Sequence, residues 1–269
     1  MTVSSAEYAP PRASYLVCAS QRTGSTLLCD ALADTNLLGR PREYFWDGDE
    51  RLWSSRWKAE RLLMEDGYAA YLSAVLRAGT TDSGIFGAKL MWNHAEDFLG
   101  KLAATRELAG TAKPDLLHAV FPGLRAVHLV RRDKIAAAVS QWRAEVSGRW
   151  RDDGDGGTYL GPPPPLDVIR VTVLHEYQHA AEAGWPRLLR AARVPFCQVS
   201  YDEIVTDREG SVRRIAAFVD EATELPLPLP SPRTRRQSDR ATSGYVSSWV
   251  DATGGCVACG SVNAAASSP

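Results

Sequence analysis

Short apolar runs alternate with amphipathic stretches along this chain. Four runs have the length and composition of buried strands: residues 15–19, 84–92, 124–130 and 196–201. Apolar residues recur at helical spacing after the first run and across residues 51–77, 95–120, 166–192 and 211–219. Strands that alternate with helices predict an α/β fold with a mainly parallel sheet flanked by helices.

The helix expected after the third apolar run has recognisable ends. Asp133 is a favourable N-cap, the helical pattern continues to Ser147, and Gly148 is a typical stop. Clusters of glycine and proline predict a loop at residues 154–165 and a connector at residues 225–232.

The chain has 269 residues, which suits one large α/β domain or two small ones, and we assign the domain to residues 14–252. Residues 1–13 are polar and proline-rich, and residues 253–269 are poor in apolar side chains. A flexible leader and a disordered tail are therefore expected. The first apolar run is too short for a signal peptide or a membrane span, which predicts a cytoplasmic protein without membrane insertion.

Charge and cysteine usage narrow the function classes. The formal net charge is −1, so no general basic field points to a nucleic-acid partner. Cys18, Cys29 and Cys197 lie in apolar segments and are expected to be reduced core thiols. Cys256 and Cys259 form a single C-x-x-C, which is half of a zinc motif, so no metal site is predicted.

The junction between the first strand and the first helix carries a chemical signal. The apolar run from Tyr15 to Ala19 ends in Ser-Gln-Arg-Thr-Gly-Ser-Thr, and Leu27 and Leu28 begin the helical pattern. Backbone N–H groups in such a loop, together with the dipole of the following helix, favour a phosphate-like anion. The alternative is a simple turn that joins a buried strand to a helix.

Comparison with the nucleotide-triphosphate loop G-x-x-x-x-G-K-[ST] refines this interpretation. Gly24 takes the second glycine position and Thr26 the hydroxyl position, but Ser25 stands where the lysine would be. Arg22 can supply the cation, and its guanidinium suits a forked anion. The loop therefore predicts a nucleotide with an anion at its 5′ end, and not ordinary ATP or GTP turnover.

Further charged residues follow other predicted elements. Arg131 and Arg132 come directly after the third strand, and the carboxyl ends of parallel strands share one edge of a sheet. Lys89 interrupts the second apolar run, so it lies at the open end of that strand or points into a polar site. Residues 39–46 form a turn with charges and then three aromatics, which could line a pocket mouth or cover the core. Residues 233–240 are strongly basic. They could form a flap over an anionic ligand or a solvated charged loop.

Several stretches in order resemble the Stf0-type family of PAPS-dependent sulfotransferases, the trehalose 2-sulfotransferase family. They are residues 15–28, 39–45, 87–93, 128–133 with 140–144, and 236–239. The resemblance implies an actinobacterial-type enzyme with a P-loop-like fold. It would move a sulfuryl group from 3′-phosphoadenosine-5′-phosphosulfate (PAPS) to a hydroxyl of a carbohydrate or glycosylated metabolite. PAP would be the product, and no metal would be needed.

The resemblance also implies a two-ended donor site. The 5′-phosphosulfate would lie in the loop formed by Gln21, Arg22, Thr23, Gly24, Ser25 and Thr26. Arg132 and Ser140 have the spacing of a 3′-phosphate site, and Tyr201 corresponds to a position near adenine. The residues expected to close over the donor are Arg236, Gln237 and Arg240. Arg22 would be catalytic by stabilising charge that develops during in-line transfer.

On the acceptor side, the resemblance assigns Glu43 as the base that takes the hydroxyl proton. A salt bridge between Glu43 and a neighbouring arginine is the alternative. The residues expected to contact the acceptor are Arg42, Tyr44, Phe45, Lys89, Trp92 and Asn93. The acceptor would be a sugar, a glycolipid or a glycosylated natural product, and the family suggests a homodimer.

Two other functions compete with this hypothesis. A P-loop kinase acting on a small hydroxyl substrate would consume ATP with magnesium, and Ser25 in the lysine position argues against it. A non-catalytic nucleotide-binding protein would bind the donor nucleotide but transfer nothing.

Overall fold

The computed structural model describes residues 10–57, 67–150, 164–225, 228–231 and 240–254. The chain forms two compact units. Unit 1 comprises Met1–Arg132 and His179–Arg233, and unit 2 comprises Asp133–Gln178 and Thr234–Pro269. Most of the expected leader and tail lies outside the described residues.

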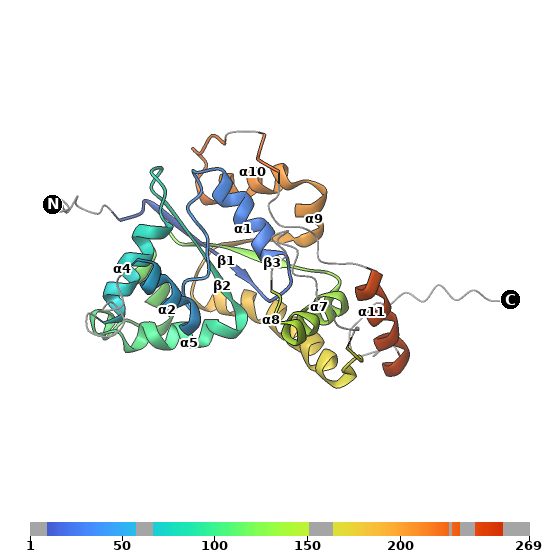
Figure 1. Ribbon diagram of the computed structural model, residues 1–269. Coiled ribbons are helices and arrows are strands. Elements are labelled where there is room, and N and C mark those ends of the chain that lie inside the picture. The colour runs from blue at the N-terminus through green and yellow to red at the C-terminus, as the bar shows by residue number, and fades with distance from the viewer. Residues whose placement is uncertain (1–9, 58–66, 151–163, 226–227, 232–239, 255–269) are drawn as a thin grey trace. The chain divides into compact units, whose positions relative to one another are not determined.

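Unit 1 is built on a four-stranded parallel sheet (Figure 1). The strands are β1 (Ala13–Ala19), β2 (Ile85–Met91), β3 (Arg125–Val130) and β4 (Phe196–Ser200). Their order is β2-β1-β3-β4, and every neighbouring pair is parallel. The α/β fold with a parallel sheet is confirmed, and the carboxyl ends of all four strands meet at one edge.

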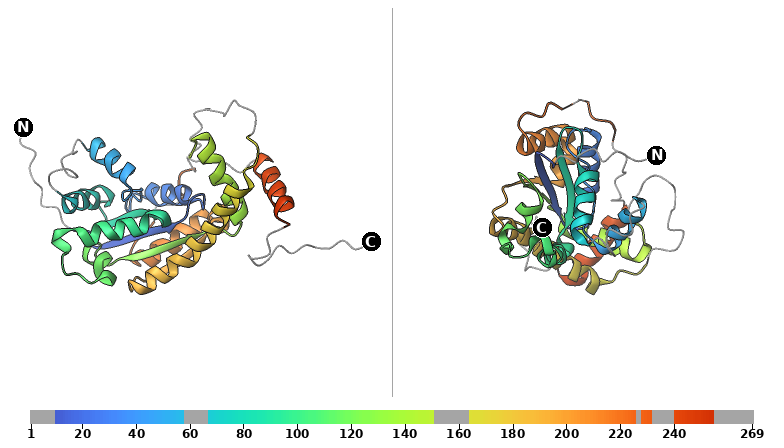
Figure 2. Two further views of the ribbon diagram at one scale, coloured as in Figure 1. Left: turned by 90° about the horizontal axis from the view of Figure 1, so that it is seen from below. Right: turned by 90° about the vertical axis from the view of Figure 1, so that its left-hand side faces the viewer.

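Helices cover both faces of this sheet, which is why its strands read as continuous apolar runs (Figure 2). Leu16 and Cys18 of β1 belong to one core cluster, whereas Tyr15 and Val17 belong to the other. The first cluster packs α4 (Tyr68–Gly79), α5 (Trp92–Ala104), α6 (Leu116–Val120) and the second half of α8 (Val168–Ala191). The second packs α1 (Ser25–Asp34), α9 (Tyr201–Thr206) and α10 (Arg208–Val219).

Unit 2 contains α7 (Lys134–Ser147), the first half of α8 and α11 (Arg240–Thr253). Its core cluster includes Trp142, Leu174 and Trp249. The expected ends of the helix after β3 are confirmed: the Asp133 side chain accepts a hydrogen bond from the Ala136 N–H, and Gly148 adopts a left-handed φ of 69°.

Elsewhere the sequence prediction was partly wrong. The helical pattern across residues 51–77 corresponds to α2 (Asp47–Arg56) and α4, with residues 58–66 outside the described part. Residues 95–120 are divided among α5, two 3₁₀ turns (Arg106–Leu108 and Lys113–Asp115) and α6. Helix α11 had no sequence prediction. The loop at residues 154–165 and the basic segment at residues 233–240 fall almost entirely outside the described residues.

His128 on β3 gives the fold a pH dependence. The residue is 1% exposed, and its Nδ1 has no hydrogen-bond partner in the described part of the chain. Burial lowers the pKa of His128 from 6.5 to about 4, although the charge of Glu182 acts in the opposite direction. Between these two values the unfolded chain binds the proton and the folded chain does not, so stability falls as the pH falls.

We therefore expect a His128→Leu variant to lose less stability than the wild type as the pH is lowered from 6.5 towards 4. Urea unfolding followed by circular dichroism at several pH values measures this, because only the difference between the two proteins reports His128. Parallel pH dependences of the two proteins would contradict the prediction.

Candidate functional site

The loop between β1 and α1, residues 20–24, has the backbone shape of an anion cradle. Arg22 and Gly24 have left-handed φ values of 63° and 87°. Such a backbone turns successive N–H groups towards one point. Gly24 is the N-cap of α1, so the unpaired N–H groups of that helix begin at the same place. Thr23 is buried and donates its hydroxyl to the Ser20 carbonyl at 2.7 Å, so its side chain shapes the loop from within.

Two residues that directly follow other strands, Arg131 after β3 and Tyr201 at the start of α9, support this loop. Arg131, at the end of β3, donates from Nη1 to the Arg22 carbonyl at 2.8 Å. The Arg131 guanidinium carbon lies 4.9 Å from the centroid of the Tyr201 ring, a cation–π contact. Tyr201 packs directly on Gly24, because a Cβ at position 24 would lie 2.4 Å from the Tyr201 Cδ2 atom. Arg131 and Tyr201 therefore hold the two left-handed residues of the loop in place.

We expect the Arg131→Met variant to bind 3′,5′-ADP (PAP, the product expected from the sequence) about tenfold more weakly, because the charged hydrogen bond to the loop and the cation–π contact with Tyr201 are lost. Isothermal titration calorimetry measures the affinity. Arg125 offers a matched control: it lies at the other end of β3, donates to the Val219 carbonyl and lies over the Phe218 ring. Equal loss of affinity in Arg131→Met and Arg125→Met would show a general effect on folding instead.

The first turn of α5 lies against the anion loop. Gln21 donates from Nε2 to Asn93 Oδ1 at 2.5 Å, and Asn93 Nδ2 lies 3.0 Å from the Nε2 atom of His94. The His94 ring stacks on Trp46 with ring centroids 5.4 Å apart. Partial burial lowers the pKa of His94, and the negative charge of Glu43 partly offsets this effect. The anion loop, the first turn of α5 and the segment that contains Trp46 therefore meet around Asn93 and His94.

Glu43 forms an ion pair with Lys89. The Lys89 Nζ atom lies 2.5 Å from Glu43 Oε1, and the Lys89 side chain is 5% exposed whereas that of Glu43 is 32% exposed. The backbone around Glu43 runs parallel to β2, and the Lys89 N–H donates to the Arg42 carbonyl at 2.8 Å. Trp53 of α2 donates to the Glu43 carbonyl at 2.7 Å. A carboxylate with a fixed backbone and a buried counter-charge thus faces solvent with about a third of its surface.

The other expected acceptor contacts differ in position. Arg42 pairs with Asp30 of α1 at 2.9 Å. Tyr44 and Phe45 are 2% and 1% exposed and belong to the first core cluster, where Phe45 contacts Phe98 and Phe121, so their burial favours the alternative in which these aromatics cover the core. Both rings are buried because this segment packs directly on the first core cluster, of which Tyr44 and Phe45 are members. Their contact with an acceptor stays a prediction.

Trp92, close to Lys89 in the chain, is half-buried, and Cys29 of α1 is buried. Trp92 packs edge-on against Trp185, with ring centroids 5.2 Å apart. Burial raises the pKa of the Cys29 thiol to about 12, although the charges of Lys89 and Arg42 act in the opposite direction. Cys18 and Cys29 are buried free thiols, as expected, and Cys197 is a half-buried one.

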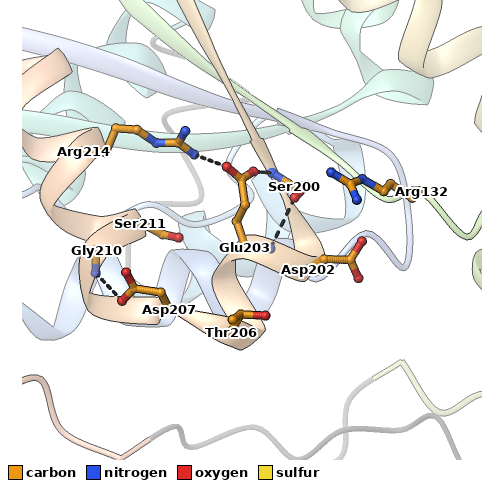
Figure 3. A pocket seen from close by; sticks show the side chains of 9 residues that line it. All are labelled: Arg132, Ser200, Asp202, Glu203, Thr206, Asp207, Gly210, Ser211 and Arg214. Atoms are coloured by element: carbon orange, nitrogen blue, oxygen red, sulfur yellow. Dashed lines mark hydrogen bonds and ion pairs between the residues drawn. The ribbon is translucent and has the colours of Figure 1, made fainter.

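A pocket of about 500 Å³ lies where β3 and β4 end in unit 1. Figure 3 shows Arg132 and Arg214 on opposite sides of Ser200 and Glu203. The remaining lining residues are Asp202, Thr206, Asp207, Gly210 and Ser211. The Glu203 carboxylate accepts from the Ser200 N–H and from Arg214, and the first of these bonds lowers the pKa of Glu203 most.

The structure brings together only part of the expected donor site. Arg132 lines the pocket, and Ser140 lies on α7 in unit 2. Arg236 and Gln237 lie outside the described residues, and of Arg240 only the backbone, the first residue of α11, is described. Ser25 is buried at the start of α1, and Thr26 follows it in the first turn.

Sequence reasoning missed the roles of two residues near the loop. Arg131 was noted beside Arg132, but only the 3′-phosphate spacing to Ser140 was used, which singles out Arg132. His94 carries no motif of its own, although it directly follows Asn93, which was expected to contact the acceptor. The adjacent arginines 131 and 132 after β3 could have suggested that one supports the loop and the other lines a binding site.

Neither a metal site nor a membrane-spanning helix is evident in the described residues. No cluster of three or more histidine, cysteine, aspartate or glutamate side chains there has the arrangement of a metal site. None of the helices in that part of the chain combines the length and apolarity of a membrane span.

The chain is similar to known sulfotransferases over most of its length. It is 29% identical over 270 residues to trehalose 2-sulfotransferase of Mycolicibacterium smegmatis, an alignment that covers 86% of this chain and 92% of that protein. Trehalose 2-sulfotransferase of Mycobacterium tuberculosis is 26% identical over 262 residues, with coverage of 88% and 92%. Among solved structures, a sulfotransferase from Alicyclobacillus acidocaldarius aligns with 91% of this chain and 94% of its own, at 15% identity and a TM-score of 0.46.

The sequence model of one family matches residues 14–251, which include the anion loop, Glu43, Lys89 and the Arg131–Arg132 pair. The resemblance noted from the sequence is thereby confirmed: the chain belongs to the Stf0 sulphotransferase family.

Proposed function

We propose that the protein transfers a sulfuryl group from PAPS to a hydroxyl of a carbohydrate or a glycosylated metabolite. One observation carries the proposal: the anion loop and the Glu43–Lys89 pair are both linked to the junction of β2 and α5. Gln21 of the loop contacts Asn93, and Lys89 lies on β2 just before that junction. The loop proposed to bind the donor anion and the candidate base are thus linked to the same edge of the sheet.

The donor would occupy two places. The loop with Arg22, Gly24, Ser25 and Thr26 suits the 5′-phosphosulfate, because left-handed backbone and a helix N-terminus present N–H donors to an anion. Arg132, which lines the pocket where β3 and β4 end, is proposed to bind the 3′-phosphate, and the carboxylates of Asp202, Glu203 and Asp207 in the same lining would keep that phosphate on the Arg132 side. Ser140, Arg236, Gln237 and Arg240 are proposed to complete that end. Tyr201 is proposed to lie near the adenine, and it also supports the loop by packing on Gly24.

The proposed reaction is an in-line displacement at sulfur. The acceptor oxygen forms a bond to sulfur as the bond from sulfur to the 5′-phosphate oxygen breaks, and PAP leaves with that electron pair. Arg22 and the loop N–H groups stabilise the charge that develops on the leaving oxygen and the sulfuryl oxygens. Glu43 takes the hydroxyl proton, while Lys89 keeps its carboxylate oriented. Positioning and electrostatics supply the rate enhancement, as in phosphoryl transfer.

The acceptor class follows from the relatives. Both curated relatives are trehalose 2-sulfotransferases, so trehalose is the first acceptor to test. Glycolipids and glycosylated natural products present the same kind of hydroxyl. A homodimer and a cytoplasmic location accompany the proposal as expectations from the sequence.

The decisive experiment supplies ³⁵S-labelled PAPS to the purified protein with trehalose, other sugars and glycosylated metabolites. A gain of one sulfate in an acceptor, seen by mass spectrometry, supports the proposal. In a thermal-shift assay 3′,5′-ADP should stabilise the protein more than 5′-AMP does, because only the former carries a 3′-phosphate. Equal stabilisation together with magnesium-dependent ATP consumption would overturn the proposal in favour of a kinase.

A further inference from the structure

Trp46 differs from the two aromatic residues that precede it. Tyr44 and Phe45 are buried, whereas Trp46 is 46% exposed. Tryptophan is enriched at contact surfaces because it combines a large apolar ring with a polar N–H. The position of Trp46 next to the Glu43 segment raises the question of what its exposed face contacts.

The Trp46 ring is held in one orientation. It stacks on His94 at 5.4 Å with an interplanar angle of 28°. It also packs closely on Gly48, because a Cβ at that position would lie 2.7 Å from the six-membered ring of Trp46. A ring that is fixed before a ligand arrives loses little conformational entropy on binding.

The Trp46–His94 pair lies beside both halves of the proposed active site. His94 contacts Asn93, which accepts a hydrogen bond from Gln21 of the anion loop. Glu43 lies three residues before Trp46 in the same segment, and its charge also acts on His94. An acceptor whose hydroxyl reaches both the loop and Glu43 would therefore meet this stacked pair.

Other tryptophans suit this role less well. Trp92 packs against Trp185 in the core of unit 1. Trp142 is 3% exposed and packs against Tyr245 in unit 2. Trp53 donates its ring N–H to the Glu43 carbonyl, so it supports the backbone of the candidate base.

We propose that the stacked pair Trp46–His94 is the floor of the acceptor subsite and receives the C–H face of a pyranose ring. One face of a pyranose is largely apolar and its hydroxyls project from the rim, which matches an aromatic face surrounded by polar groups. Asn93, the His94 ring nitrogens and Glu43 supply those groups. The inference rests on the proposed function and names the sugar-binding surface within it.

The test measures sugar binding without requiring turnover. Saturation-transfer difference NMR is recorded on the full chain saturated with 3′,5′-ADP, with trehalose and with the methyl α- and β-D-glucopyranosides as probes. At least one probe should bind the wild type through its ring C–H protons. Trp46→Ala should weaken that binding about tenfold, and Trp46→Phe should restore most of it, because an aromatic face returns.

Leu52→Ala is the matched control, since Leu52 is 44% exposed on α2, the helix that Trp46 caps, and should bind the sugar as the wild type does. Wild-type binding by Trp46→Ala, or no binding of any probe by the wild type, would overturn the inference. A different result would overturn the proposed function. In that case a sugar would bind the wild type and bind Trp46→Ala more weakly, but no ³⁵S label would pass from PAPS to that sugar.

Discussion

The Glu43→Gln variant is expected to transfer sulfate about 10²- to 10⁴-fold more slowly than the wild type, which is the usual contribution of a general base. Glutamine keeps the size and a hydrogen-bonding oxygen for Lys89, but its amide cannot take the proton from the acceptor hydroxyl. The anion loop is held by Arg131 and Tyr201, so the affinity for 3′,5′-ADP should change little. Initial rates at saturating donor and acceptor measure the loss, and calorimetry measures the nucleotide affinity.

Because Glu43 also pairs with Lys89, the Glu43→Gln variant could lose activity through lower stability as well as through loss of the base, and a control variant separates the two causes. Lys89 is nearly buried, so removal of its counter-charge lowers the stability of the fold as well. Glu50→Gln is the matched control, because Glu50 is also a carboxylate paired with a lysine, Lys101, in a largely buried pair, but lies on α2 and is not among the expected site residues. It should keep wild-type transfer. If Glu43→Gln binds nucleotide and still transfers at the wild-type rate, Glu43 is not the base.

Features determined by neighbouring residues could be predicted from the sequence. The anion loop follows from an apolar run, a glycine and a helical pattern in direct succession. Asp133 and Gly148 were recognised as helix ends because capping depends on residues within one turn. The parallel sheet followed from the alternation of strands and helices alone. Local sequence features were therefore sufficient to predict most of the fold and the anion loop of the candidate site.

Contacts between distant segments could not be predicted in the same way. Glu43 and Lys89 were each expected to serve the acceptor, but their ion pair depends on the register of the Glu43 segment beside β2. Local residues also do not decide which of three successive aromatics is exposed, so the burial of Tyr44 and Phe45 could not be derived from the sequence. Helix α11 is rich in serine and threonine, weak helix formers, and is stabilised by tertiary contacts of Tyr245 and Trp249.

The Gly24→Ala variant is expected to bind 3′,5′-ADP about 100-fold more weakly and to lose sulfate transfer accordingly. Two costs add: a left-handed φ of 87° is unfavourable for alanine, and the new Cβ would lie 2.4 Å from the Tyr201 ring. Tyr201 cannot move aside without losing its contact with Arg131, so the loop leaves its anion-binding shape. Apparent affinity falls by the fraction of molecules that keep the competent shape. Calorimetric titration with 3′,5′-ADP measures the effect.

A second substitution separates the steric cost from the backbone cost. In Gly24→Ala with Tyr201→Ala, the clash is removed but the left-handed alanine remains, so partial recovery of affinity relative to Gly24→Ala alone indicates the steric term. Gly100→Ala is the matched control: Gly100 lies within α5, no atom stands within 4 Å of its added Cβ, and alanine there stabilises the helix. Its nucleotide affinity should equal that of the wild type. A Gly24→Ala protein that binds 3′,5′-ADP as tightly as Gly100→Ala would mean that the shape of this loop does not determine donor binding.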